Sequence, residues 1–173
     1  MILPIHKYGS PVLRKKTFDI DKGDFFKEIA GNMALTLKKA GGIGLAGPQV
    51  GALKNIFIID LTCLKDTGLE IFEKTYFNPV IVHYGDNNVY YNEGCLSIPG
   101  INEEVLRPEK IEVRYRDENF DWREEVLDEL IARVFQHEYD HLQGILFIDK
   151  LSPLRKKLLK NKLREIKSSQ HLY

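Results

Sequence analysis

The pattern H-E-x-x-H occupies residues 137–141, within the stretch Gln136-His137-Glu138-Tyr139-Asp140-His141. On an α-helix, side chains at positions i and i+4 project from one face about one turn apart, so His137 and His141 can share a metal ion. The adjacent Glu138 can then reach a water molecule bound to that ion. A catalytic metal site is therefore the first hypothesis for this sequence.

The residues around this pattern predict the helix that it requires. Asp128 is a candidate N-cap, and the helix is expected to run to Gln143, with Gly144 as the residue that ends it. Leu130 and Val134 continue the helical stripe of the two histidines, so both imidazoles are expected to face the interior. A lone buried histidine commonly only hydrogen-bonds to a backbone carbonyl, but a facing pair with an intervening glutamate favours a metal.

A catalytic site of this kind uses three protein ligands and leaves one position for water, so a third ligand is needed. The candidates are Cys95, Cys63 and His83. Cys95 is favoured because it follows Gly94, and glycine lets the backbone approach another element closely. Cys63 is expected to be a small buried residue near the end of a strand.

A glycine-rich stretch over residues 42–47 matches the dinucleotide fingerprint G-x-G-x-x-G. The fingerprint needs a strand before it and a helix after it, whereas this stretch follows a predicted helix and leads to a predicted strand. We therefore expect no nucleotide site here. A backbone that lies against a ligand or a metal centre explains the glycines better, and Gln49 follows at once with two N–H donors.

The rest of the pattern predicts an α+β fold, with mainly antiparallel strands packed around the central metal-binding helix. Helices are expected over 24–40 and from Ser152-Pro153 onward, and strands over 55–61, 77–84, 89–95 and 111–115. The pair Asn78-Pro79 is expected to place the start of its strand at a sheet edge. Residues 1–173 are expected to form a single domain.

Composition places the chain in the ordinary globular class. Hydrophobic residues make up 43% and charged residues 29% of the sequence, which argues against disorder, collagen-like repeats and a disulfide scaffold. The apolar stretches are far shorter than the roughly 20 residues of a membrane-spanning helix. No signal peptide is apparent in residues 1–30, so we expect a protein that stays in the cytoplasm with reduced cysteines.

The formal net charge of zero hides a basic C-terminal segment. Residues 152–173 carry a charge of +6, from seven Lys and Arg residues and one acid, and residues 1–151 carry −6. Two apolar rows at helical spacing predict that one side of this helix docks on the protein: Leu151-Leu154-Leu158 and Leu159-Leu163-Ile166. A solvated face is favoured over an anionic partner, and a uniformly basic nucleic-acid binder would look different.

Three motifs in this order and at these separations resemble those of the peptide deformylases: residues 42–49, the stretch Glu93-Gly94-Cys95-Leu96-Ser97, and residues 136–141. The similarity extends from residues 8–14 to residues 146–149. Two departures are Gly47, where many members carry alanine and which is expected only to loosen the loop, and residues 128–130, where a glycine often precedes the motif helix. The resemblance implies removal of the N-formyl group from the initiator formylmethionine of new polypeptides, which releases formate.

The resemblance also implies a metal centre. Cys95, His137 and His141 would bind one divalent ion, with Fe²⁺ the expected native ion and Zn²⁺, Ni²⁺ or Co²⁺ able to replace it. Glu138 would be the general base that takes a proton from the metal-bound water and later returns it to the leaving amine.

Further residues follow from the same resemblance. Gln49 and the backbone N–H of Leu96 would bind the oxyanion, and Gly44 would be a backbone partner for the substrate peptide. The methionine side chain needs an apolar slot, which we expect from Ile43, Leu96 and Val134. Arg133 is expected at the edge of that slot, where its stem packs.

The partners implied are N-formylmethionyl nascent peptides in the bacterial cytoplasm and, through the basic C-terminal helix over 152–173, the ribosome. Neither a membrane nor a sequence-specific nucleic acid is expected, and the protein is expected to be a monomer. Two alternatives remain open. One is a zincin-type endopeptidase, whose third ligand is His, Glu or Asp; the other is a structural metal domain, in which Cys63 would have to supply a fourth ligand.

Overall fold

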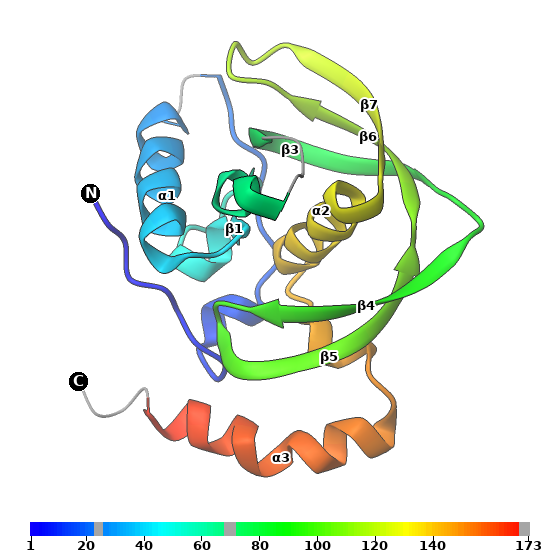
Figure 1. The fold of residues 1–173 in the computed structure, drawn as a ribbon. Helices are drawn as coiled ribbons and strands as arrows, with labels where there is room; N and C mark the ends of the chain where they lie inside the picture. The colour runs from blue at the N-terminus through cyan, green and yellow to red at the C-terminus, as the bar shows by residue number, and fades with distance from the viewer. Residues whose placement is uncertain (23–25, 68–71, 170–173) are drawn as a thin grey trace.

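Helix α2 (Glu129–Leu142) lies between two antiparallel sheets in the computed structural model, which describes residues 1–22, 26–67 and 72–169. The larger sheet has the order β1 (Gly44–Ala46), β2 (Ile56–Asp60), β3 (Glu73–Tyr84), β6 (Lys110–Arg116) and β7 (Trp122–Asp128). The smaller sheet is the hairpin of β4 (Asn88–Cys95) and β5 (Ile98–Pro108). Figure 1 shows α2 in the centre, with β3, β6 and β7 on one side and β4 and β5 on the other. The predicted α+β class is confirmed.

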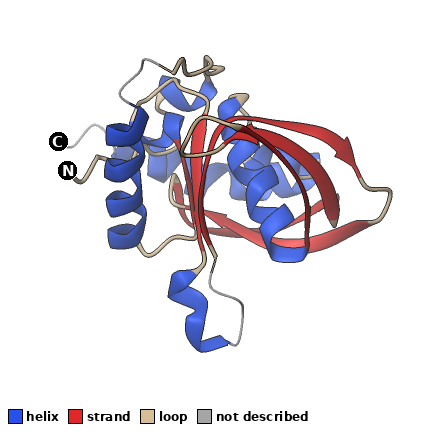
Figure 2. Cartoon of the chain, turned by 90° about the horizontal axis from the view of Figure 1, so that it is seen from above, coloured by secondary structure: helices blue, strands red, loops and turns tan. Residues whose placement is uncertain are grey.

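The other helices pack around this frame. Helix α1 (Phe26–Ala40) covers the larger sheet on the face away from α2 (Figure 2). Helix α3 (Pro153–Ser168) runs along the outside of β5 (Figure 1). Gly41 ends α1 with a φ of 67°, and the Ser152 side chain accepts a bond from Arg155 N at 3.3 Å at the start of α3. The described residues also form four short 3₁₀ helices: η1 (Pro11–Arg14), η2 (Gly47–Val50), η3 (Thr62–Thr67) and η4 (Phe147–Lys150).

Strand β2 is buried along its whole length because helices cover both of its faces. Ile56 and Ile58 belong to the core beneath α1, whereas Phe57 and Ile59 belong to the core beneath α2. Alternation across a strand sends successive side chains to opposite faces, so a run of four apolar residues such as 56–59 is expected only where both faces are covered.

Aromatic packing fixes how α2 is rotated about its axis. The Phe135 ring lies 4.8 Å from that of Phe57 and 4.9 Å from that of Tyr76, measured between centroids. Positions two residues apart on a helix point about 200° apart, so a Phe135 that faces the larger sheet turns His137 toward the β4–β5 hairpin. The core of the larger sheet thus aims the H-E-x-x-H face at the element that carries Cys95.

Several expected elements are confirmed and others need correction. The helix over 24–40 is observed from Phe26, and residues 23–25 lie outside the described part of the chain. Strands β1, β5 and β7 were missed. In α3, Leu159 and Leu163 are buried, whereas Leu154 and Leu158 are 67% and 63% exposed, so one side of the helix docks on the protein as predicted.

The prediction that Asn78-Pro79 marks a sheet edge was also wrong. Strand β3 lies between β2 and β6, and the pair sits inside it at a shift of register between Phe77 and Val80. Asn78 adopts a φ of 47°, and its side chain bonds both Ile20 N and Ile20 O at 2.8 Å. A bulge is the other place where a sheet tolerates proline, because the ladder is already interrupted there.

No helix in the described ranges is long and apolar enough to cross a membrane.

Strand β7 passes directly into α2 at Glu129, which has a φ of 47° and is exposed. Asp128 holds the N-cap position without a capping bond from its side chain. A left-handed conformation costs a residue with a Cβ roughly 1 kcal/mol or more, and glycine avoids that cost. We predict that Glu129→Gly raises the free energy of unfolding in urea by about 0.5–1 kcal/mol. The matched change Glu124→Gly, in the regular part of β7, should lower it; a lower value for Glu129→Gly would contradict the prediction.

Candidate active site

Cys95, His137 and His141 form a cluster whose ligand atoms all lie within 4.8 Å of one another. Cys95 Sγ is 3.3 Å from His141 Nε2. A sulfur about 2.3 Å and a nitrogen about 2.0–2.1 Å from one tetrahedral ion lie roughly 3.5 Å apart, so this spacing fits a shared metal. One thiolate and two imidazoles suit Fe²⁺ or Zn²⁺. The residues present therefore fit the expected divalent ion.

The other two candidate ligands lie outside the cluster. His83 is exposed on β3, and Cys63 is exposed in η3, with its Sγ 4.0 Å from the carbonyl oxygen of Gly42. The prediction that Cys63 is a buried apolar residue was wrong. It follows a buried strand, but the chain turns outward into a 3₁₀ helix before the sulfur is covered.

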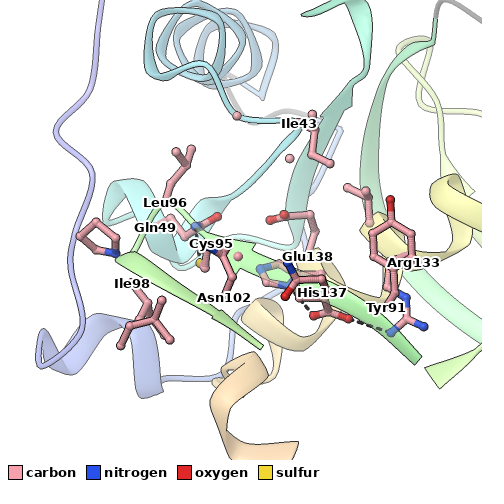
Figure 3. Close-up of a pocket in the computed structure, with 18 of the residues that line it drawn as sticks. Ile43, Gln49, Tyr91, Cys95, Leu96, Ile98, Asn102, Arg133, His137 and Glu138 are labelled. Carbon is pink, nitrogen blue, oxygen red and sulfur yellow. Dashed lines mark hydrogen bonds and ion pairs between the residues drawn. The ribbon is translucent and has the colours of Figure 1, made fainter. Parts of the chain in front are cut away.

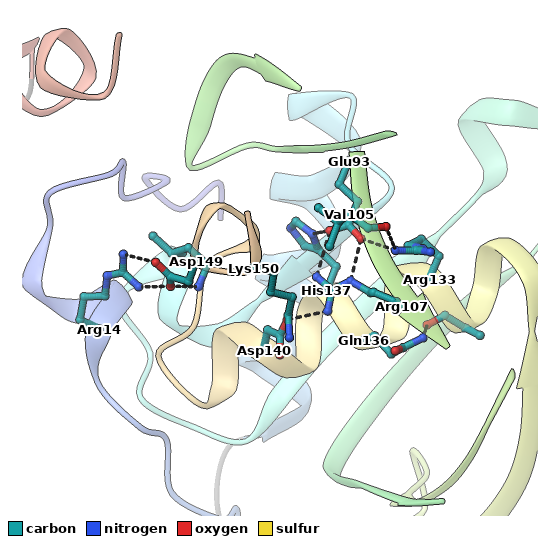
Figure 4. A network of polar contacts seen from close by, with 12 residues as sticks. Arg14, Glu93, Val105, Arg107, Arg133, Gln136, His137, Asp140, Asp149 and Lys150 are labelled. Carbon is teal, nitrogen blue, oxygen red and sulfur yellow. Dashed lines mark hydrogen bonds and ion pairs between the residues drawn. The ribbon is translucent and has the colours of Figure 1, made fainter. Parts of the chain in front are cut away.

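The carboxylate of Glu93 contacts the ring of His137 at Nδ1 and orients it. Its Oε2 lies 2.9 Å from His137 Nδ1 and accepts a bond from Arg107 Nη2 at 2.9 Å, and its Oε1 accepts one from Arg107 Nε at 2.6 Å (Figure 4). Arg107 also donates to Asp140 Oδ2 at 2.6 Å. Burial raises the pKa of Glu93, but hydrogen bonds from His137 and Arg107 outweigh it and hold the pKa well below its usual range. A carboxylate on Nδ1 leaves Nε2 as the free ring nitrogen of His137.

Burial shifts the pKa values of Glu138, His141 and His137, and for His137 hydrogen bonds reverse the direction. It raises the pKa of Glu138 to about 7, and Glu138 Oε2 is a buried oxygen without a hydrogen-bond partner among the described residues. Burial lowers the pKa of His141 well below its ordinary value, and the nearby charge of His137 adds to this. For His137 burial also lowers the pKa, but hydrogen bonds to Cys95 and Glu93 raise it well above the ordinary value.

Gln49 is 1% exposed, and both the oxygen and the nitrogen of its side-chain amide are hydrogen-bonded. Its Oε1 accepts a bond from Ala46 N at 2.7 Å, and its Nε2 donates to Ser97 Oγ at 3.2 Å. With the oxygen committed to Ala46, the NH₂ group must face Cys95, whose Sγ lies 3.5 Å away. The side chain is thus a pre-oriented donor beside the metal ligands, as Figure 3 shows.

A cavity of about 450 Å³ opens over this cluster. Its lining includes every predicted site residue except the buried His141: Ile43, Gly44, Gln49, Cys95, Leu96, Arg133, Val134, His137 and Glu138. It also includes residues that the sequence did not single out: Lys7, Tyr91, Asn92, Ile98, Pro99, Gly100, Ile101 and Asn102. The alternating pattern of β5 begins at Ile101, so it was a signal for Ile101 but not for Ile98, three residues earlier.

A family model described as polypeptide deformylase matches residues 2–157. A peptide deformylase of Cytophaga hutchinsonii is 45% identical over 169 residues, which cover 96% of this chain and 91% of the relative. One of Christiangramia forsetii is 46% identical over 177 residues, with 96% and 90% covered. The chain belongs to the peptide deformylase family.

Solved structures of peptide deformylases share this fold. The enzyme of Thermus thermophilus superposes with a TM-score of 0.87 at 38% identity, covering 98% of this chain and 99% of that one. A plant peptide deformylase gives 0.89 at 36% identity, with 97% and 90% covered. Peptide deformylases are metal-dependent hydrolases that act on formylmethionyl nascent peptides, so the expected fold, family and reaction are confirmed.

One departure from the family pattern needs a different explanation from the one expected. A Cβ atom on Gly47 would lie 2.7 Å from the carbonyl oxygen of Ala52 and 2.8 Å from that of Lys54. Gly47 therefore does more than loosen the loop: it lets η2 pack against two carbonyl groups of the following turn. The other departure falls on Glu129, in the left-handed conformation that glycine adopts without strain.

The guanidinium of Arg133 is committed to the frame of the peptide deformylase cavity. It donates to the carbonyl oxygens of Val105 at 2.9 Å and Val89 at 2.7 Å and to Glu93 Oε1 at 2.9 Å. It also lies 5.7 Å from the centre of the Tyr91 ring. Since these contacts occupy the charged end, the stem is the part left to face the cavity.

Strand β1 passes directly against the carboxylate of Glu138. A Cβ atom on Gly44 would lie 2.8 Å from Glu138 Cδ and closer still to its Oε1. We predict that Gly44→Ala displaces this carboxylate and lowers kcat for a formylated peptide by about 10- to 100-fold, with metal content unchanged. Gly31→Ala is the matched control, because nothing lies within 4 Å of a Cβ there. Full activity of Gly44→Ala would show that the carboxylate can move without cost.

Proposed function

We propose that this chain hydrolyses the N-formyl group of formylmethionyl nascent peptides at the cavity over α2, with Cys95, His137 and His141 holding a divalent metal ion. One observation carries the assignment: the three ligand atoms meet within 4.8 Å beside the unpartnered carboxylate oxygen of Glu138. We take Fe²⁺ as the native ion and Zn²⁺, Ni²⁺ or Co²⁺ as substitutes, because the donor set of one soft and two borderline ligands suits all four.

In this proposal Glu138 moves the proton. A divalent ion in this site polarises the formyl oxygen and acidifies water. Glu138 accepts a proton from the attacking water at its free Oε2 and delivers it to the departing amine nitrogen, a role that suits a carboxyl with a pKa of about 7. Gln49 Nε2 and the backbone N–H of Leu96 donate to the oxyanion, and one such donor is typically worth about 10²- to 10³-fold.

The peptide and its methionine side chain are proposed to lie along β1 and α2. Strand β1 is the last strand of its sheet, so its outer edge can pair with an extended peptide, with Gly44 as the backbone partner. The apolar slot is assigned to Ile43, Leu96 and Val134, with the stem of Arg133 at its edge; all four line the cavity. A flexible thioether fills such an irregular apolar slot well.

The test is anaerobic purification with metal analysis, followed by assay of a formyl-methionyl peptide and its acetyl counterpart. We expect formate from the first peptide and no acetate from the second, because the methyl group that replaces the formyl hydrogen makes the acyl group larger and its carbonyl carbon less electrophilic. Cleavage of internal peptide bonds would favour the zincin-type endopeptidase instead. Metal-loaded protein without formate release would overturn the proposal.

We also propose that residues 1–173 act as one metallohydrolase domain, monomeric and in the bacterial cytoplasm, whose α3 approaches the ribosome. Basic residues of α3 line a groove of about 570 Å³, among them Lys157, Lys160 and Arg164. Replacing these three with glutamine should weaken co-sedimentation with ribosomes, and added salt should weaken it for the unaltered protein. Salt-insensitive binding, or binding unchanged in the triple variant, would contradict the contact.

A further inference from the structure

The N-terminal segment joins the two elements that carry the proposed oxyanion donors. His6 N donates to the carbonyl oxygen of Gln49 at 2.7 Å, and Tyr8 N donates to that of Ser97 at 2.8 Å. Residue 49 belongs to η2, and Ser97 to the turn between β4 and β5. In Figure 1 this segment, in blue, passes beside the end of the β4–β5 hairpin. Two backbone bonds thus hold η2 and the turn at a fixed separation.

Lys7 lies between these two bonds, and its side chain reaches the same turn. Its Nζ donates to the carbonyl oxygen of Leu96 at 2.7 Å, and the residue lines the cavity. Burial lowers the pKa of Lys7, while the charge of Cys95 acts in the opposite direction. Arg133, the other long basic side chain of the lining, has its guanidinium on Glu93 and two backbone carbonyls.

The Leu96 carbonyl is important because it belongs to the same residue as a proposed oxyanion donor, the Leu96 N–H. The Leu96 C=O shares a peptide plane with Ser97 N, and the Leu96 N–H shares one with the Cys95 carbonyl, and the two planes meet at the Leu96 Cα. A charge-assisted bond to the C=O holds the first plane, and through this shared Cα it limits how far the second plane can tilt. A turn residue without such a bond is free to tilt, and a tilted N–H stabilises an oxyanion less well.

We propose that Lys7 is a positioning residue for the oxyanion site: its ammonium holds the Leu96 carbonyl and thereby fixes the direction of the Leu96 N–H. This inference rests on the proposed deformylase function. It assigns the N-terminal segment a part in catalysis, since His6, Lys7 and Tyr8 together brace Gln49 and the turn at 96–97. Lys7 acts through Leu96 and needs no contact with the formyl group.

The test compares Lys7→Met with Lys7→Arg, and uses Lys16→Met as the matched control because Lys16 is an exposed lysine of the same N-terminal region. We expect kcat of Lys7→Met on a formyl-methionyl peptide to fall about 10-fold, less than when a donor is deleted outright. KM should change less than about 2-fold, since the oxyanion forms only in the transition state. Lys7→Arg keeps a donor and should recover most of the loss, and Lys16→Met should match the unaltered protein.

A spectroscopic readout separates positioning from general stability. In Zn²⁺-loaded protein labelled with ¹⁵N-leucine, the Leu96 amide resonance should shift in Lys7→Met and return toward its original place in Lys7→Arg. An unchanged kcat, or a loss of kcat that tracks metal content and Tm and is not recovered by Lys7→Arg, would overturn this inference alone. An unaltered, metal-loaded protein that releases no formate would overturn the proposed function and this inference with it.

Discussion

Replacing Glu138 with glutamine is expected to lower kcat/KM for a formylated peptide by about 10²- to 10⁴-fold while the protein keeps its metal. The side chain is 3% exposed, and its Oε2 has no hydrogen-bond partner in the described structure. Glutamine has nearly the same shape but cannot accept a proton, so the loss reports the base and not the packing. The metal ligands are untouched by the change, since Cys95, His137 and His141 make up the cluster without Glu138.

The matched control for this variant is Glu129→Gln, which alters an exposed glutamate at the start of the same helix. Formate release and metal content are measured on both proteins. The assigned role is contradicted if Glu138→Gln retains full activity with full metal. Loss of metal together with activity would show instead that Glu138 helps to hold the ion.

The metal centre could be predicted because its signals are local. His137 and His141 are four residues apart, and the helical stripe that they share with Leu130 and Val134 indicated that both imidazoles face the interior. The structure confirms both points: all four side chains lie on the side of α2 that faces the cavity or the cluster, and Gly144 ends the helix region with a φ of 74°. The third ligand was harder to predict, because only the neighbouring glycine favoured Cys95 over Cys63 and His83.

The polar support of the site could not be predicted, because it depends on strand pairing. Strand β5 alternates between buried and exposed positions, but two of its buried positions are the charged residues Glu103 and Arg107. A strand is recognised in a sequence by apolar residues at every second position. Because these two inward-facing residues are charged, β5 shows that pattern only in part. Only the pairing of Glu93 with Glu103 across β4 and β5, and the packing of the hairpin on α2, bring Arg107 to Glu93 and Asp140.

The errors at Cys63 and at Asn78-Pro79 share a cause. Both were inferred from a residue's type and its place in a strand, whereas the outcome was set by how the backbone departs from the regular strand. At Asn78 the departure is a bulge sealed by two bonds to Ile20, and at Cys63 it is the 3₁₀ helix that follows β2. Such departures depend on contacts with distant segments, which a local pattern does not contain.

Cys95→Ala is expected to lose bound metal and activity together. The thiolate is one of the three proposed protein ligands, and losing even an outer partner of a ligand typically weakens metal binding by about 10- to 100-fold. We therefore expect metal affinity to fall by at least about 10²-fold, measured by competition with a chelator. The apo protein should stay folded, because the buried residues of the cores on both sides of α2 are apolar and aromatic residues outside the cluster, and Cys95 is only a partly buried neighbour of one core.

Cys63→Ala is the matched control and also separates a catalytic from a structural centre. Cys63 is exposed, with its Sγ near the Gly42 carbonyl oxygen, and it is not part of the cluster. A closed structural site would need it as a fourth ligand, so retention of metal and activity by Cys63→Ala argues for three protein ligands and one open position. Wild-type metal affinity in Cys95→Ala would mean that the third ligand lies elsewhere. Parallel loss in both variants would mean that the two sulfurs meet at the ion, which would leave no open position for hydrolysis.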